Sequence, residues 1–233
     1  MARQVRSEAT RRKILDAAID VFGEVGYPSA GWGTIIERTG MTKGALYHHF
    51  DSKESLASAI IDEGSDTLLG AFRNVCGSSS PALENMIHGT FTVGNVLRSD
   101  KIARAAEQLT CALSGFNESA TRFCTGLVEL LAAEARRAQA EGDLRSDLDP
   151  AIVSESIIGA LLGTRLLSHA IPAMGVEANL IKRTGQLWEL LLPGIVTDSS
   201  YQYFRQFLAR EALRHVRLAE SSHPETIMES EVT

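Results

Sequence analysis

The chain has 233 residues, of which 44% are hydrophobic and 22% are charged. This is the mixture of an ordinary globular protein of one or two domains, and the length suffices to bury a core without disulfides or metals. It excludes collagen-like, low-complexity and wholly disordered chains. No apolar run approaches the ~18 residues of a membrane span, and the polar, charged N-terminus does not resemble a secretory signal. We therefore expect a cytoplasmic protein with no membrane partner.

The cysteines are Cys76, Cys111 and Cys124, and none of them belongs to a CxxC pair. An odd number of cysteines without metal-ligand spacing argues against a disulfide framework and against a zinc module. We expect reduced, mostly buried thiols, no metal site and no cofactor.

Charge is unevenly distributed along the chain, whose net charge is −6. Residues 1–50 carry seven Lys and Arg against five Asp and Glu, whereas the remainder carries 16 against 24. A polyanionic partner is therefore expected to meet the N-terminal segment, which is the mildly basic part.

Hydrophobic spacing predicts helices almost throughout, and no segment shows the alternation and turns of paired strands. Gly26, Gly40 and Pro193-Gly194 are expected to end helices. The predicted helices span residues 8–24, 33–39, 43–50, 53–75, 82–97, 101–113, 118–140, 150–171, 176–192 and 199–219. We expect an all-α fold with a small head (8–68), a larger helical body (69–220) and a disordered acidic tail (221–233).

Residues 31–50 predict two short helices joined by a tight turn. Gly40 provides the left-handed residue that ends the first helix, and Thr42 caps the second. Lys43, Tyr47 and His48 then face outward, where Lys43 suits a guanine edge or a phosphate and the other two suit phosphates. A pair of helices of this kind either reads DNA or is an αα-hairpin that binds nothing. The shared core is predicted to consist of Ile35, Ile36, Leu46 and Phe50.

The run Thr42-Lys43-Gly44-Ala45-Leu46-Tyr47-His48-His49-Phe50-x-x-Lys53-Glu54-x-Leu56 closely resembles the signature of the TetR family of transcriptional repressors. The preceding helix from Thr10 to Ala18 and the motif Phe22-x-x-x-Gly26-Tyr27 resemble the same family. The resemblance covers about residues 8–68. It implies a three-helix DNA-binding head on a helical body that binds a ligand and forms the homodimer. It further implies a dimer that occupies a pseudo-palindromic operator and leaves it when a small molecule binds.

The family's DNA contacts can be carried onto this chain residue by residue. The family usually has a Thr-rich start to the first helix of the motif; here Gly31-Trp32-Gly33 stands there, and Thr34 is the candidate for the hydroxyl contact. Trp32 is expected to fill core space. The basic residues Arg3 and Arg6 are expected to add phosphate or minor-groove contacts. The matching contact positions are Thr42, Lys43, Gly44, Ala45, Tyr47, His48 and Lys53.

The later segment Ala140-Glu141-Gly142-Asp143-Leu144-Arg145, before an Asp-Pro-led apolar helix, is similar to the γ-butyrolactone receptors that control antibiotic production in actinomycetes. Those receptors usually carry a Trp in the helix before such a Gly-Asp-Leu turn, and this chain has Leu127 there. Two effector classes therefore stay open. One is an autoregulator butyrolactone or butenolide, and the other is an antibiotic or pathway product sensed by a pseudo-receptor.

The candidate effector pocket is drawn from the central helices of the body. Thr110 and Arg165 stand out because polar groups on apolar helices need partners. The alternative for each candidate is core packing, and for Arg165 it is an ion pair with Glu129 or Glu155. The candidates are Thr90, Phe91, Leu109, Thr110, Phe123, Leu127, Ile157, Leu161 and Arg165.

The dimer face is predicted on the helices at 151–171 and 176–192. Gly159, Ala160 and Gly163 permit close helix approach, and pairing across a two-fold axis gives a four-helix bundle. The alternative is that the small residues serve internal packing. The apolar area is predicted to come from Leu187, Trp188 and Leu191.

The sequence contains no P-loop, no dinucleotide fingerprint, no HExxH and no nucleophile elbow, so we predict no catalytic residue and no enzyme. His48 and His49 are neighbours on a helix and point apart, which disfavours a joint metal site. Two other functions stay open. The chain could be a multidrug-sensing regulator of an efflux gene, or a helical binding protein that does not bind DNA.

Overall fold

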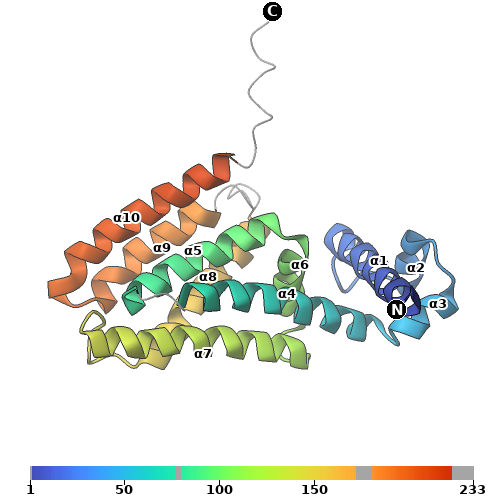
Figure 1. Ribbon diagram of the computed structural model, residues 1–233, viewed down its shortest axis with the longest axis horizontal. Coiled ribbons are helices and arrows are strands. Elements are labelled where there is room, and N and C mark those ends of the chain that lie inside the picture. Colours follow the sequence, from blue (N-terminus) through green and yellow to red (C-terminus); the bar gives the residue numbers. More distant parts are fainter. Residues whose placement is uncertain (1, 77–79, 172–179, 222–233) are drawn as a thin grey trace, which may run out of the picture. The chain divides into compact units, whose positions relative to one another are not determined.

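The computed structural model describes residues 2–76, 80–171 and 180–221, and within them the chain is helical with no strand, apart from one isolated bridge between Leu144 and Val196 (Figure 1). The predicted all-α fold is confirmed. The helices are α1 (Ala2–Val25), α2 (Trp32–Thr39), α3 (Lys43–His49), α4 (Lys53–Cys76), α5 (Ala82–Ser99), α6 (Lys101–Leu113), α7 (Glu118–Glu141), α8 (Pro150–Ala170), α9 (Leu180–Ile195) and α10 (Asp198–Ser221).

Helix ends follow the glycines and caps that the sequence offers. Gly26 and Gly40 adopt φ angles of 76° and 64°, the left-handed region that ends α1 and α2. Asp149 caps α8 by accepting from the backbone N–H of Ala151 at 2.8 Å. Pro193 was expected to stop α9, and this prediction is wrong, because α9 continues to Ile195.

The last turn of α9 is held from outside the helix. Arg145 N donates to Ile195 O at 3.0 Å, and Thr197 N donates to Asp143 O at 2.9 Å. Pro193 removes only its own N–H from the helix, and the bonds to the 143–145 turn satisfy the Ile195 carbonyl and the Thr197 N–H beyond it. A turn far away in the sequence therefore fixes where α9 ends.

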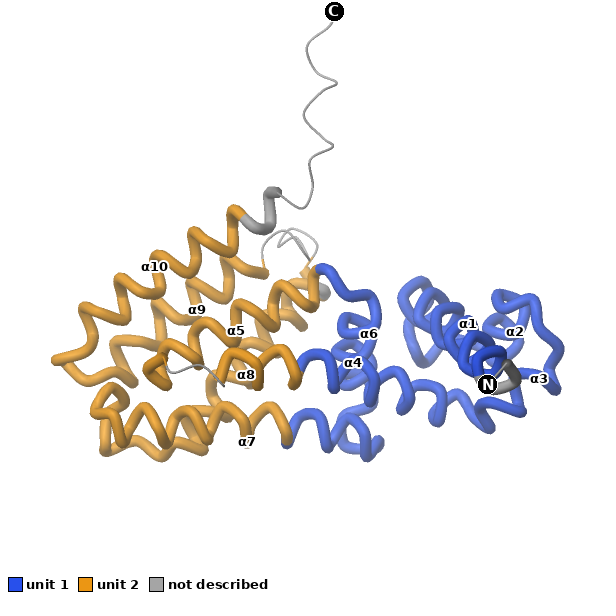
Figure 2. The backbone as a smooth tube through the Cα atoms, in the orientation of Figure 1, with its two compact units in different colours: residues 1–68, 99–125 blue, residues 69–98, 126–233 orange. Residues whose placement is uncertain are grey.

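The chain divides into two compact units (Figure 2). Unit 1 comprises residues 1–68 and 99–125, and unit 2 comprises residues 69–98 and 126–233. The division falls inside α4 and α7, so each of these helices contributes to both units. Segment 99–125, assigned to the body by the sequence prediction, is part of unit 1.

In unit 1, α1 packs against α2 and α6. Lys101 of α6 bonds Asp20 of α1 with an Nζ–Oδ1 distance of 2.6 Å. Helices α4 and α6 approach so closely that a Cβ on Gly64 would lie 2.4 Å from the Ala106 Cβ and 2.7 Å from the Ile102 carbonyl oxygen. Gly64 is therefore required by packing, and a side chain there forces the two backbones apart.

In unit 2, α9 packs against α8 and α10 around a core that includes Phe91, Trp188 and Phe204. Trp188 is fully buried, and its Nε1 donates to Thr90 Oγ1 at 2.8 Å. The prediction that Trp188 supplies apolar area for dimerisation is wrong, because its side chain is fully buried in the core of its own chain. Leu187 and Leu191 on the same helix are half-buried.

Helix α8 is the most apolar surface element of unit 2. Among the described residues its segment Pro150–Ser168 is long and apolar enough to cross a membrane, and 28% of this stretch is buried in the fold. Ile152, Leu166 and Leu167 are exposed by 58%, 63% and 49%. These exposed side chains give α8 an apolar face, and an apolar segment of this length was not expected from the sequence.

Two predicted features lie outside the described residues. They are the start of the predicted 176–192 helix and the part of the predicted tail beyond Ser221.

Candidate functional site

The α2–turn–α3 segment forms the helix–turn–helix that the sequence predicts. Gly40 N donates to Glu37 O at 3.1 Å and closes α2, and Thr42 Oγ1 accepts from Ala45 N at 3.3 Å and caps α3. Leu46 is fully buried and Phe50 is 6% exposed, so α3 is anchored by one face. Its remaining residues are left for contact with a partner.

The outward face of α3 carries Lys43, Gly44, Tyr47 and His48, all exposed, with Ala45 half-buried beside them. Lys43 Nζ lies 5.7 Å from the centroid of the Tyr47 ring. A cation over the face of an aromatic ring is attracted by the ring quadrupole. The ammonium is thereby held near the ring while its donors stay accessible to an acceptor in a groove.

Trp32 of α2 supports this face from beneath. Its ring lies 5.6 Å from that of Tyr47 at an interplanar angle of 57°. The side chain is half-buried, so it only partly fills the core space that the sequence predicts for it, and its buried Nε1 has no hydrogen-bond partner among the described residues. Trp32, Tyr47 and Lys43 therefore form a row of ring and cation contacts across α2 and α3.

Lys53, a predicted DNA contact, is bound to the loop between α1 and α2. Its Nζ donates to Tyr27 O at 2.8 Å, Ala30 O at 3.1 Å and Pro28 O at 3.4 Å, and it lies 4.4 Å from the Tyr27 ring centroid. An ammonium has three donors, and here all three are directed at carbonyls of the loop. The geometry favours a role in holding α2 against α4.

An ion pair that the sequence analysis missed joins α1 to α2. Arg38 Nη1 and Nη2 donate to the two carboxylate oxygens of Glu24 at 2.8 and 2.7 Å. The hydrogen bond from Arg38 lowers the pKa of Glu24, and the same bond raises the pKa of Arg38. The separation of 14 residues matches no helical spacing, so only the fold reveals the pair.

The other predicted contact residues lie on α1 and α2. Arg6 and Thr34 are exposed, and Arg3 belongs to α1. A Cβ on Gly33 would meet no atom within 4 Å, so the family's usual Thr would fit there without repacking. The DNA-contact assignments of these residues, and of Thr42, Lys43, Gly44, Ala45, Tyr47, His48 and Lys53, stay predictions.

The predicted pocket residues are divided between the two units. Leu109, Thr110 and Phe123 belong to unit 1, and the other six belong to unit 2. Thr110 is 3% exposed, and its buried hydroxyl has no hydrogen-bond partner among the described residues, which is the feature that a ligand contact would explain. Thr90 instead uses its hydroxyl on Trp188 and on the Ile87 carbonyl.

The remaining pocket candidates differ in burial. Phe91, Ile157 and Arg165 are buried, whereas Leu127 and Leu161 are half-buried. Leu127 lies on α7, whose C-terminal end leads into the Gly142 turn. These assignments also stay predictions.

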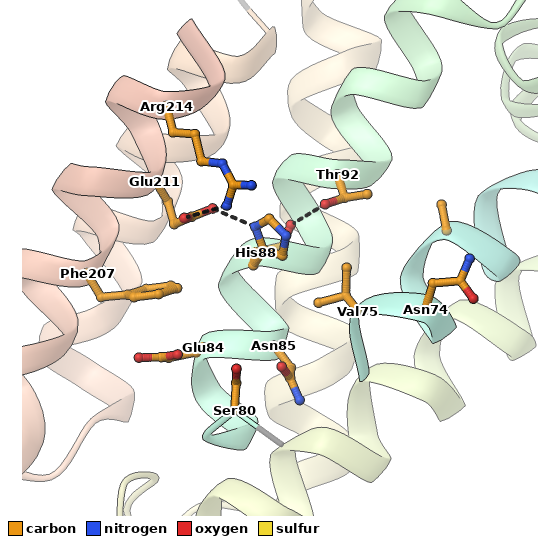
Figure 3. Close-up of a pocket in the computed structure, with 11 residues that line it drawn as sticks. Asn74, Val75, Ser80, Glu84, Asn85, His88, Thr92, Phe207, Glu211 and Arg214 are labelled. Carbon is orange, nitrogen blue, oxygen red and sulfur yellow. Dashed lines mark hydrogen bonds and ion pairs between the residues drawn. The ribbon is translucent and has the colours of Figure 1, made fainter. Parts of the chain in front are cut away.

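Unit 2 contains a cleft of about 590 Å³ that the sequence analysis did not anticipate (Figure 3). None of the nine predicted pocket residues lines it. Its wall holds His88 of α5 and Glu211 of α10, whose side chains face each other. The lining residues are Ala71, Asn74, Val75, Ser80, Glu84, Asn85, His88, Thr92, Phe207, Glu211 and Arg214.

The ionisable groups of this wall are perturbed by their surroundings. Burial acts to raise the pKa of Glu211, but the hydrogen bond from His88 and the nearby positive charges outweigh it and lower the pKa. Burial lowers the pKa of His215, which lies one turn from Glu211. The only hint in the sequence is the i,i+4 spacing of Glu211 and His215, because His88 is 123 residues from Glu211.

Two family models match this chain. Residues 14–60 match "Bacterial regulatory proteins, tetR family", and residues 80–197 match "Tetracyclin repressor-like, C-terminal domain". The A-factor receptor protein of Streptomyces griseus is 32% identical over 195 residues, which cover 84% of this chain and 67% of that protein.

Solved structures agree with these matches. The crystal structure of a γ-butyrolactone receptor (ArpA-like protein) is 27% identical with a TM-score of 0.75, and the match covers 90% of this chain and 99% of that one. CprB of Streptomyces coelicolor, solved in complex with its operator, is 27% identical with a TM-score of 0.72 and the same coverage. The helix–turn–helix at the N-terminus and the helical remainder are thus matched together, and the chain belongs to the TetR family of bacterial transcriptional regulators.

Proposed function

We propose that this protein is a cytoplasmic transcriptional repressor, and not an enzyme, that occupies a pseudo-palindromic operator as a homodimer and is released by a small molecule. The observation that carries the DNA-binding part is the outward face of α3, where Lys43, Tyr47 and His48 are exposed while Leu46 anchors the helix. The related CprB was solved with its operator, which supports the same role here.

In this proposal α3 enters the major groove. Lys43 donates to a guanine edge, which is the contact that specifies sequence, and the Tyr47 hydroxyl bonds a phosphate, which is the contact that sets register. Trp32 keeps Tyr47 in place, and Lys53 holds the loop that precedes α2. Two such helices in a dimer read half-sites about 34 Å apart, one turn of DNA.

The dimer is proposed to form through α8 with α9. The exposed Ile152, Leu166 and Leu167 of α8 and Leu190 of α9, which is 77% exposed, supply apolar area. Gly159 and Gly163 lie on α8, and a Cβ on either would meet no described atom outside the backbone of α8 within 4 Å. Among the described residues, no neighbouring helix requires glycine at these positions, which is consistent with close approach by a partner helix.

The effector is proposed to be a butyrolactone or butenolide, or an antibiotic or pathway product, with a role in secondary metabolism. The matches to the A-factor receptor and to γ-butyrolactone receptors support this class. A ligand releases DNA only if it binds the DNA-incompetent conformation more tightly. Helix α4 begins after α3 and continues into unit 2, so a conformational change that a ligand causes in unit 2 can be transmitted along α4 to α3.

The test is binding of the full chain to duplex DNA from its own upstream region. We expect a specific complex with one or two dimers per operator, whose affinity falls steeply as salt rises because phosphate contacts release counterions. A random duplex of equal length serves as the control. Absence of any complex with the upstream duplex at low and high salt would contradict the proposal.

A further inference from the structure

Two histidines and a glutamate converge in unit 2, on α5 and α10, beside the cleft of Figure 3. His88, Glu211 and His215 each offer a ligand atom within 4.8 Å of the other two. Glu211 Oε2 lies 2.5 Å from His88 Nδ1 and 3.2 Å from His215 Nε2. One carboxylate oxygen therefore faces two imidazole nitrogens from two different helices.

This donor set matches the preferences of zinc and related divalent transition metals. Imidazole nitrogen and carboxylate oxygen bind zinc at about 2.0–2.2 Å, and three protein ligands with one open position are the pattern of accessible zinc sites. Tetrahedral bonds of that length place ligand atoms about 3.3 Å apart. The Glu211–His215 pair already has this spacing. His88, whose side chain is 28% exposed, has to withdraw from Glu211 by less than about 1 Å and to lie at this spacing from His215, whose ligand atom is now within 4.8 Å of its own.

The surroundings orient these ligands. His215 Nδ1 lies 2.5 Å from the Asn95 amide, and the His215 ring stacks on Phe91 at 5.2 Å and 18°. The remote nitrogen of a metal-binding histidine donates its N–H to an acceptor. Metal binding through Nε2 therefore requires the Asn95 amide to be turned so that its oxygen, in place of Nδ2, accepts from His215 Nδ1. Arg214 Nη1 lies 3.6 Å from the other oxygen of Glu211, Oε1, and so leaves Oε2 to the histidines.

Burial makes it costly to leave the ionisable groups of this cluster unpaired. The side chains of Glu211 and His215 are 9% and 4% exposed, and buried ionisable groups are costly unless they are paired or coordinate a metal. His88 and Glu211 also line the cleft, so an ion between them is reachable from solvent.

We propose that His88, Glu211 and His215 bind one divalent transition-metal ion, with Zn²⁺ as the first candidate, and that the ion joins α5 to α10 at the wall of the cleft. Asn95 acts as a positioning residue for His215. This site goes beyond the proposed repressor function and does not depend on how α3 reads DNA.

The experiment uses the untagged full-length protein after removal of metals with a chelator. Zn²⁺ is titrated by calorimetry, and Co²⁺ serves as a spectroscopic probe of coordination. We expect one ion per chain, a tetrahedral Co²⁺ spectrum and a melting temperature that rises with Zn²⁺, since binding to the folded state stabilises it.

Three variants and one control locate the site. His88→Gln and Glu211→Gln should each weaken Zn²⁺ binding by more than about 100-fold, beyond the loss expected for an outer-shell partner, and Asn95→Ala should weaken it by about 10–100-fold. Glu84→Gln removes another carboxylate of the same cleft and should leave affinity within about twofold. Circular dichroism establishes that each variant is folded.

The proposal is overturned if the wild-type protein binds no Zn²⁺, or if folded His88→Gln and Glu211→Gln keep wild-type affinity and stoichiometry. His88 is the most solvent-exposed of the three proposed ligands, so His88→Gln is the variant that should disturb folding least. Operator binding is not the readout, and a negative result therefore leaves the repressor function untouched.

Discussion

The head and unit 2 present their chemistry in opposite ways. In the head, the side chains proposed to read DNA lie within six consecutive residues, Lys43 to His48, and they point to solvent from one short helix. In unit 2 the polar groups are buried and meet across long sequence separations, such as 98 residues between Trp188 and Thr90 and 123 between His88 and Glu211. A surface that contacts DNA can be formed by residues that lie close together in the sequence, whereas an interior site is formed by residues from several helices.

The largest effect that separates the two regions is expected from their cores. Leu46→Ala in α3 and Leu83→Ala in α5 each remove a fully buried side chain, and each should cost about 2–5 kcal/mol of folding free energy. Only Leu46→Ala should also abolish operator binding at a temperature where the variant is still folded, because Leu46 anchors the reading helix. Chemical denaturation and operator titration measure the two effects; equal operator affinities for both variants would remove the distinction.

A smaller loss is expected at Lys53. Lys53→Met keeps the apolar stem and leaves the carbonyls of Tyr27, Pro28 and Ala30 without their donor, which should cost about 1–3 kcal/mol. The salt dependence of operator binding should stay unchanged. If Lys53 instead contacts a phosphate, stability will be unaffected and the salt slope will fall by about one.

Leu127→Trp tests whether Leu127 of α7 lines the effector pocket. If Leu127 lines the pocket, the variant should shift effector sensitivity by about tenfold, or about 1.4 kcal/mol, while ligand-free operator affinity stays intact. Titration with butyrolactones, butenolides and candidate antibiotics, following operator release, measures the shift. If Leu127 is plain core, the added ring costs about 1–3 kcal/mol of stability and the ligand ranking does not change.

The smallest effect is expected for the cysteines, because their accessibility can be measured on the wild-type protein without any substitution. Burial, with a smaller contribution from Glu134, raises the pKa of the Cys76 thiol to about 12, whereas the Cys111 side chain is exposed, against the expectation of mostly buried thiols. A thiol whose pKa is higher in the folded state favours folding at lower pH and loses that contribution as the pH rises toward 12. Iodoacetamide at pH 8 should therefore modify Cys111 first, as mass spectrometry will show, and faster labelling of Cys76 would contradict its burial.

Much of the helical architecture could be predicted from the sequence because its signals are local. Gly26, Gly40 and Thr42 fix their helix ends through their own backbone preferences and side chains. Pro193 misled the prediction because the turn at 143–145, some 50 residues earlier, secures the end of α9. Trp188 misled it because apolar spacing does not tell a core face from a partner-facing one.

The candidate sites divide in the same way. The outward face of α3 follows from helical spacing and a family signature, both contained in the 42–56 run. The His88, Glu211 and His215 cluster and the cleft beside it depend on the packing of α5 against α10, which no local pattern specifies. The engagement of Lys53 with the 27–30 loop likewise appears only once α4 is folded onto its neighbours.

The central claim is that α3 reads DNA sequence through Lys43, and the direct measurement is the ratio of dissociation constants for the operator and a random duplex at one salt concentration. Lys43→Ala should lose about 1–3 kcal/mol of operator binding and relax the preference at one base position. Tyr47→Phe, the matched control on the same face, should weaken both duplexes more evenly, because its hydroxyl is assigned to a phosphate. A folded Lys43→Ala variant that binds the operator with wild-type affinity and selectivity would contradict the account.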